Sequence, residues 1–198
     1  MEAKLGEQAT KAGIVSRARA GETTARAPLN ALGDVRLLLL GMWVGAAMFF
    51  SFAVAPSAFI VLPARELAGA IVTRTIGIVN VGGFIIGLLL LATAFAGRGA
   101  ARKRAWLLEV CALALLALAT GIGHWLISAR MQALRLSMGR PIDELAQSDP
   151  LRLAFNDLHG YSVAAMTTAM LAGIVAFILI ARRNRNVESQ VSSPKSQV

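Results

Sequence analysis

Four long apolar runs, separated by short clusters of charged residues, dominate the chain. The last of them, from Ser162 to Ala181, contains no formally charged residue. A helix rises about 1.5 Å per residue, so a run of this length matches a hydrocarbon core of roughly 30 Å. The pattern predicts an all-α integral membrane protein, a four-helix up-down bundle with spans at about 36–62, 70–96, 105–128 and 159–181.

Local signals predict where these helices end. Pro56 interrupts the first run and should kink that helix, because proline lacks a backbone donor. The third helix should continue past the membrane to a stop at Gly139. Ser148 or Asp149 is a suitable N-cap for the last helix, with Pro150 in its first turn. Helices three and four should therefore extend beyond the outer face.

The two ends of the chain lack a sustained apolar period. Residues 1–34 and 184–198 mix small, polar and charged side chains that bury too little surface to offset the entropy of ordering. We expect both to be disordered cytoplasmic tails around a membrane domain at 35–183.

Composition and charge narrow the class. The chain is 56% hydrophobic with a net charge of +9, but its basic residues stand mainly in tails and at span ends, without interleaved aromatic residues. This pattern argues against a nucleic-acid partner and is typical of topology determinants. Fourteen of the 20 Lys and Arg residues fall in the two tails, at Arg36, at Arg182 and Arg183, and in the loop at 97–104, which predicts cytoplasmic termini. The chain uses Arg more than Lys, which fits a GC-rich bacterial genome, so we expect the protein in a bacterial inner membrane.

The chain offers little conventional catalytic chemistry. It has no glycine-rich phosphate loop, no nucleophile elbow and no carboxylate pair within apolar sequence, and Cys111 is its lone cysteine. We therefore expect a protein that is not an enzyme and holds no cofactor. Gly41–Gly45 and Gly83–Gly87 are small-residue patterns that would serve intrachain packing or homo-oligomerisation equally well. Beyond the lipid bilayer, no partner is indicated.

Polar groups recur near the outer membrane boundary. Twenty residues counted from each cytoplasmic boundary reach Pro56, the neighbourhood of Asn80, His124 and the neighbourhood of His159. On the third helix His124 shares a face with Ser128, and on the fourth His159 shares one with neighbouring polar residues. Facing each other, these groups would form a polar vestibule open to the outside.

Two histidines at one membrane depth allow two interpretations of their role. His124 and His159 could ligate haem b axially, or bind copper together with Met131 or Met166. Alternatively both are interfacial residues, with Trp125 as an aromatic anchor beside His124. A separate buried charge, Glu109, is expected to pair with Arg102 or Arg104.

Several of these segments resemble the transmembrane protein 205-like family, grouped as domain of unknown function 4149. The resemblance rests on Gly41–Gly45 through Pro56, on Trp125 and Leu126, and above all on the run from Phe155 through Asn156, His159 and Gly160 to Ser162. It implies a four-helix membrane protein without an established activity, with the last run as the family motif. We expect a non-enzymatic structural, interaction or small-solute-handling role; the alternative is a haem- or copper-binding redox protein.

Overall fold

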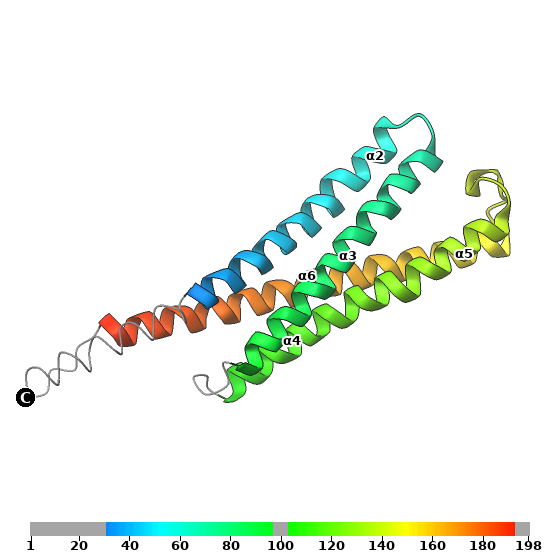
Figure 1. Cartoon of the computed structure of the whole chain (residues 1–198). Coiled ribbons are helices and arrows are strands. Elements are labelled where there is room, and N and C mark those ends of the chain that lie inside the picture. Colours follow the sequence, from blue (N-terminus) through cyan, green and yellow to red (C-terminus); the bar gives the residue numbers. More distant parts are fainter. Residues whose placement is uncertain (1–30, 97–102, 193–198) are drawn as a thin grey trace, which may run out of the picture.

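The computed structural model describes residues 31–96 and 103–192, which are helical almost throughout (Figure 1). Four helical rods in these ranges are long and apolar enough to cross a membrane: Ala31–Val61, Arg65–Phe95, Lys103–Met138 and Pro150–Arg185. The predicted all-α, four-span membrane fold is confirmed. Residues 1–30 and 193–198 of the predicted tails lie outside the described ranges, as do residues 97–102 of the basic loop.

Two of the rods change helix type along their length. The first contains the π-helical segment η1 (Phe50–Val54) and ends as α2 (Ala55–Val61). The third consists of α4 (Lys103–Gly121), the π-helical segment η3 (Ile122–Ser128) and α5 (Ala129–Met138). The others are α3 (Arg65–Ala96) and α6 (Pro150–Ser192), with the short η4 (Ile142–Glu144) before α6.

The ends of the helices follow local chemistry. Gly139 adopts the left-handed conformation, with φ of 62°, and ends α5 as expected. Asp149 Oδ1 accepts a hydrogen bond from the Leu151 N–H at 2.8 Å, and α6 begins at Pro150, so Asp149 is the predicted N-cap. At its other end α6 continues to Ser192, past the expected end at 183, because residues 184–192 contain neither Gly nor Pro.

The interruption predicted at Pro56 takes the form of η1. Proline provides no N–H for the carbonyl four residues before it and crowds that carbonyl. The helix widens just before this point, and the Ala55 N–H bonds back to the Phe50 carbonyl five residues earlier. A π-helical turn accommodates the proline without ending the rod.

The core lies toward the end of the bundle where the two termini enter, here called the terminal end; the opposite end, with residues 62–64 and 139–149, is the loop end. On the first rod the buried positions are Gly33, Arg36, Leu40, Trp43, Ala47 and Phe50. Their alternating spacing of three and four residues is that of a coiled-coil seam. The matching core residues of α3, α4 and α6 include Leu90, Leu113 and Ala176.

Glycines allow the rods to approach closely within this core. A Cβ at Gly83 would lie 2.6 Å from the Trp43 ring, and a Cβ at Gly87 would lie 2.8 Å from Leu116. The Gly83–Gly87 pattern therefore serves packing within the chain. In the other pattern a Cβ at Gly41 would lie 3.3 Å from Phe177, whereas Gly45 has no neighbour within 4 Å.

Toward the loop end the close packing gives way. No residue of α2 is buried. Figure 1 shows the α2–α3 pair leaning away from the α5–α6 pair. Long side chains bridge the separation: Arg135 Nη1 donates to Thr73 Oγ1 at 3.0 Å, and Arg65 pairs with Asp143 at 3.2 Å. The main apolar core thus lies at the terminal end. At the loop end a few residues, Ala68, Met138 and Leu145, are buried, and polar side chains connect the two helix pairs.

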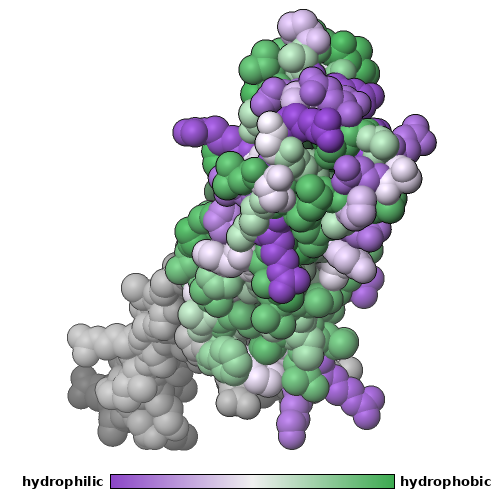
Figure 2. All heavy atoms as spheres, turned by 90° about the vertical axis from the view of Figure 1, so that its right-hand side faces the viewer, coloured by the Kyte–Doolittle hydropathy of each residue, from purple (hydrophilic) through white to green (hydrophobic). Residues whose placement is uncertain are grey.

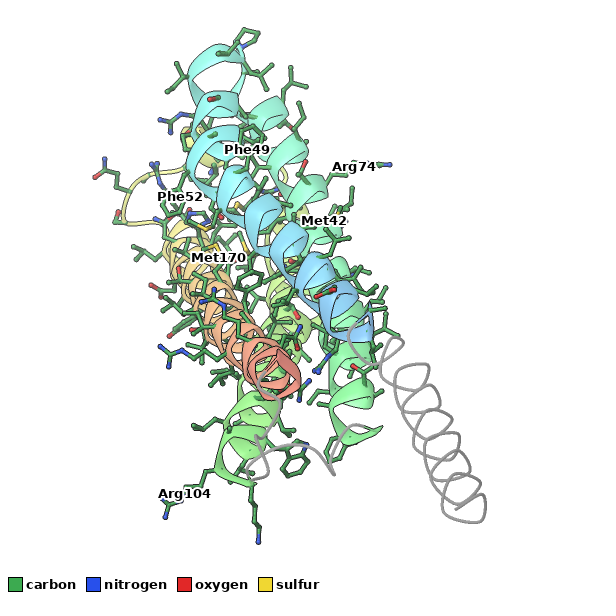
Figure 3. All side chains as sticks on the ribbon, turned by 90° about the vertical axis from the view of Figure 1, so that its left-hand side faces the viewer. Met42, Phe49, Phe52, Arg74, Arg104 and Met170 are labelled. Atoms are coloured by element: carbon green, nitrogen blue, oxygen red, sulfur yellow. The ribbon has the colours of Figure 1, made fainter. Side chains whose placement is uncertain are left out.

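The outer surface suits lipid. Apolar side chains cover much of the face shown in Figure 2, with hydrophilic groups gathered toward its upper part. In Figure 3 Met42, Phe49 and Phe52 project from the first rod, and Phe52 is 73% exposed. Large exposed apolar side chains of this kind are expected where hydrocarbon, not water, surrounds a helix.

Candidate functional site

The predicted outer polar residues do not form one vestibule; part of them meet between α3 and η3. Asn80 is buried, and a Cβ on Gly123 would lie 3.2 Å from its Nδ2. Ser128 Oγ donates to the Gly123 carbonyl at 2.8 Å, a bond across five residues that fits the wide π-helical turn. We call Asn80, Gly123, His124 and Ser128 the α3–η3 node.

His124 completes this node on the side facing α3. A Cβ at Gly77 would lie 3.8 Å from its Nδ1, and this nitrogen is buried without a hydrogen-bond partner among the described residues. The ring also lines a mainly apolar, open groove of about 610 Å³ along α3, together with Thr73 and Arg74. Trp125, the expected anchor, is 56% exposed and stands edge-on to Phe84 at 4.8 Å.

The family-motif residues of α6 have different surroundings. Asn156, His159 and Gly160 are exposed, and a Cβ on Gly160 would meet no atom within 4 Å. Ser162 is buried, while Phe155 is half-buried beneath the Arg135 guanidinium, 5.1 Å from the ring centre. Pro56 is also exposed, on α2. Within the motif, Phe155, Leu158 and Ser162 face the bundle.

The two histidines do not lie at one depth. Glu109 of α4 pairs with Arg183 of α6, Arg135 lies over Phe155, and Arg130 lines a pocket with Leu158. These contacts place His159 level with about residue 131, roughly two helical turns beyond His124. The equal-depth count therefore needs correction. It assumed that Arg104 and Arg182 begin their spans at one level, whereas Arg183 is level with Glu109.

This register does not suit ligation of one metal or haem by both histidines. In the described ranges no group of three or more His, Cys, Asp or Glu side chains could hold a metal ion. Of the two methionines considered as further ligands, Met166 is 5% exposed within the apolar core and Met131 is half-buried on α5.

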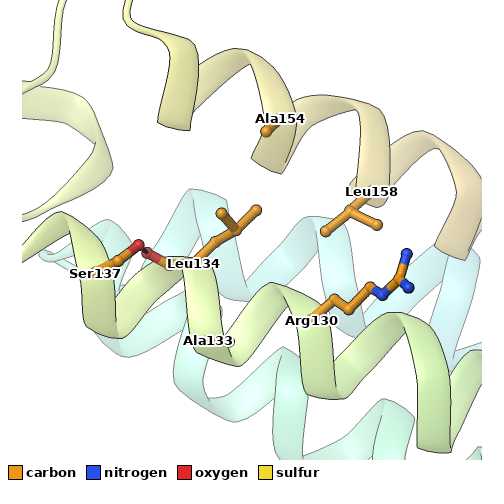
Figure 4. Close-up of a pocket in the computed structure, with 6 residues that line it drawn as sticks. All are labelled: Arg130, Ala133, Leu134, Ser137, Ala154 and Leu158. Carbon is orange, nitrogen blue, oxygen red and sulfur yellow. Dashed lines mark hydrogen bonds between the residues drawn. The ribbon is translucent and has the colours of Figure 1, made fainter.

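A second hollow lies between α5 and α6 near the loop end (Figure 4). It has a volume of about 570 Å³ and is open on one side. Leu134, Ala154 and Leu158 provide most of its apolar lining, with Arg130 and Ser137 at opposite ends. A surface hollow of this kind fits an acyl chain as well as any solute, so it defines no specific site.

The most strongly charged site lies at the terminal end and was not anticipated from the sequence. Glu109 is 2% exposed and accepts hydrogen bonds from Arg36 at 2.5 Å and from Arg183 at 2.9 Å. Arg36 is itself 2% exposed and also donates to the Leu90 carbonyl at 3.3 Å. These three side chains, the charged triad, connect the first, third and fourth rods, and Arg36 reaches α3 as well.

A sequence signal for the triad existed. Glu109 stands inside an apolar run, and a carboxylate at that depth requires a partner. We expected Arg102 or Arg104 as that partner, yet Arg104 is exposed and Arg102 lies outside the described residues. Arg36 and Arg183 were taken for topology determinants, because nothing local in the sequence shows which helix faces meet.

Comparison with known proteins gives one match. The sequence pattern of a family described as "Domain of unknown function (DUF4149)" matches residues 38–140, which is more than half of the chain. The chain belongs to the DUF4149 family. The matched part of this DUF4149 chain contains Trp43, Asn80, Glu109 and His124, but it ends before the motif from Phe155 to Ser162. No curated protein and no solved structure matches the sequence.

DUF4149 membership supports the general class and carries no activity with it. A multipass helical membrane protein with a domain of unknown function is what the fold and the family together establish. Because the matched range stops short of the α6 motif, the finer resemblance to transmembrane protein 205-like proteins is a proposal.

Proposed function

We propose that this DUF4149 protein is a non-enzymatic membrane protein that handles a small solute through a hinged four-helix bundle. The proposal rests on one observation: close packing gives way toward the loop end where two rods become π-helical, at η1 and η3. π-Helical turns are rare and occur mostly at functional sites and bends. Both segments contact α3, which carries the buried Asn80.

The physical argument combines the hinge and the node. A π-helical turn has a distorted hydrogen-bond ladder, so a small rearrangement there changes the direction of the helix beyond it. Such a change at η3 would move α5 relative to α3 and uncover Asn80 and the unpartnered Nδ1 of His124. Polar groups at this depth are costly in a membrane unless they serve a solute or a partner.

We propose that the protein lies in a bacterial inner membrane with its terminal end on the cytoplasmic side, because most of its basic residues lie at that end. In that orientation the loop end faces outward, and the charged triad closes the inner end. The protein would need no cofactor. The redox alternative is not carried forward, because the helix register separates His124 from His159.

Water access to Asn80 tests the proposal. In a Cys111→Ser background, Asn80→Cys should react with a charged methanethiosulfonate reagent applied to the loop-end side of oriented membranes, because hinge motion wets the node. Two control positions on the same helix should both react slowly: Leu90→Cys in the closed core, and Leu89→Cys, which is 53% exposed on the lipid side. The reagent reacts with the thiolate, and a cysteine that water does not reach stays as the thiol. Equally slow reaction of Asn80→Cys would contradict the proposal.

A further inference from the structure

The charged triad carries more positive than negative charge. Two guanidinium groups, from Arg36 and Arg183, share the single carboxylate of Glu109. Arg36 and Glu109 are each 2% exposed, and the Arg183 side chain is 25% exposed. The nearby Asp34 is exposed and joins no ion pair among the described residues. A formal charge of about +1 is therefore left at a site largely removed from water, which is costly unless an anion compensates it.

Two hydrogen-bond donors at this site also lack acceptors. The Nε of Arg36 is buried and makes no hydrogen bond within the described part of the chain, although the same guanidinium bonds Glu109 and the Leu90 carbonyl. The Nδ2 of Asn184 is buried without a partner as well. Buried N–H groups almost always have acceptors, so two orphans beside an excess charge indicate a missing acceptor.

The two donors come from opposite sides of the seam between the first rod and α6, which meet at Gly33 and Asn184. The Arg36 guanidinium also reaches α3 and α4. Gly33 lies one helical turn from Arg36, on the same face. A Cβ at Gly33 would lie 2.5 Å from the Asn184 Nδ2, so any larger residue at this position would displace that amide. Asn184 follows Arg183 directly, and Arg183 and Arg36 bond opposite oxygens of Glu109. The excess charge and the two unpaired donors thus lie within about one helical turn of one another along the seam.

We propose that this seam binds a phosphoryl oxyanion, held by the Arg36 Nε–H, the Asn184 amide and the positive charge of Arg183. A water molecule could accept these hydrogen bonds but would leave the charge uncompensated. The Arg36 Nε–H belongs to a charged guanidinium, and charge-assisted hydrogen bonds from such a group to phosphoryl oxygens are strong. The group could belong to free phosphate or to the headgroup of an anionic lipid, because the seam lies where the spans reach the membrane boundary. This site does not depend on motion at the loop end, so it stands apart from the proposed solute handling.

The test measures the melting temperature of the full chain in detergent, with and without inorganic phosphate at constant ionic strength. The variant Asn184→Ala removes one unpaired donor and leaves every bond of the triad in place. Arg185→Ala is the matched control, since it removes an exposed neighbouring cation. Phosphate should raise the melting temperature of the wild type and of Arg185→Ala, with an apparent affinity weakened by about fivefold or more in Asn184→Ala.

A second arm compares phosphatidylglycerol with phosphatidylcholine added to the same detergent solution. Stabilisation by phosphatidylglycerol alone, reduced in Asn184→Ala, identifies the lipid headgroup as the source of the phosphoryl group; stabilisation by inorganic phosphate identifies the free ion. The inference is overturned when neither raises the melting temperature, or when Asn184→Ala responds as strongly as the wild type. Chloride at equal ionic strength must have no comparable effect.

Discussion

At the scale of single residues, the charged triad is the feature of the terminal end that is most sensitive to substitution. Glu109 stands within the apolar sequence of α4 and pairs with two guanidinium groups from other rods. Buried ion pairs add little net stability compared with apolar residues, but removing one partner leaves an uncompensated charge. The triad therefore serves as a strong constraint on which helix faces meet at the terminal end.

The substitution Glu109→Gln measures this constraint. It retains the shape of the side chain but leaves Arg36 and Arg183 without a counter-charge, so we expect a loss of about 3 kcal/mol of unfolding free energy. Reversible unfolding in mixed micelles would measure the change. Glu144→Gln, at an exposed position of η4 without an ion pair in the described ranges, should have little effect. Equal stability of the two variants would show that the triad is not formed.

At the scale of elements, the sequence was informative wherever one segment determines its own structure. Apolar run length gave the four spans, and Gly139 and Asp149 ended and began helices as local backbone chemistry requires. The relative register of two helices is a property of their contact and has no local signal. For that reason the depth of His159 relative to His124, and the partners of Glu109, could not be obtained by counting residues.

The two glycine patterns look alike in sequence but differ in how closely neighbouring helices approach them. Gly83→Ala should destabilise the bundle by about 1–3 kcal/mol, because its Cβ would lie 2.6 Å from the Trp43 indole and force that ring to move. Gly45→Ala meets no atom within 4 Å and should be neutral or stabilising by up to about 1 kcal/mol, through higher helix propensity. Thermal unfolding of both variants in the same detergent measures the two changes in stability. A smaller loss of stability for the Gly83 variant than for the Gly45 variant would contradict the close packing of Gly83 against Trp43.

At the scale of the whole molecule, the two ends of the bundle differ in what holds them. The terminal end has the Trp43 contacts, the apolar core and the charged triad. The loop end is bridged by Arg135 to Thr73 and by the exposed pair Arg65–Asp143, and exposed ion pairs contribute at most about 1 kcal/mol. Motion should therefore concentrate between the α2–α3 pair and the α5–α6 pair.

The most direct measurement of this asymmetry is the distribution of spin-label distances in liposomes, in a Cys111→Ser background. One pair, Val61→Cys with Leu153→Cys, reports on the loop end, and Leu38→Cys with Ile178→Cys reports on the terminal end; all four positions are exposed. We predict a narrow distribution for the terminal pair and a broad or two-peaked one for the loop pair. Equally narrow distributions at both ends would contradict a hinged bundle.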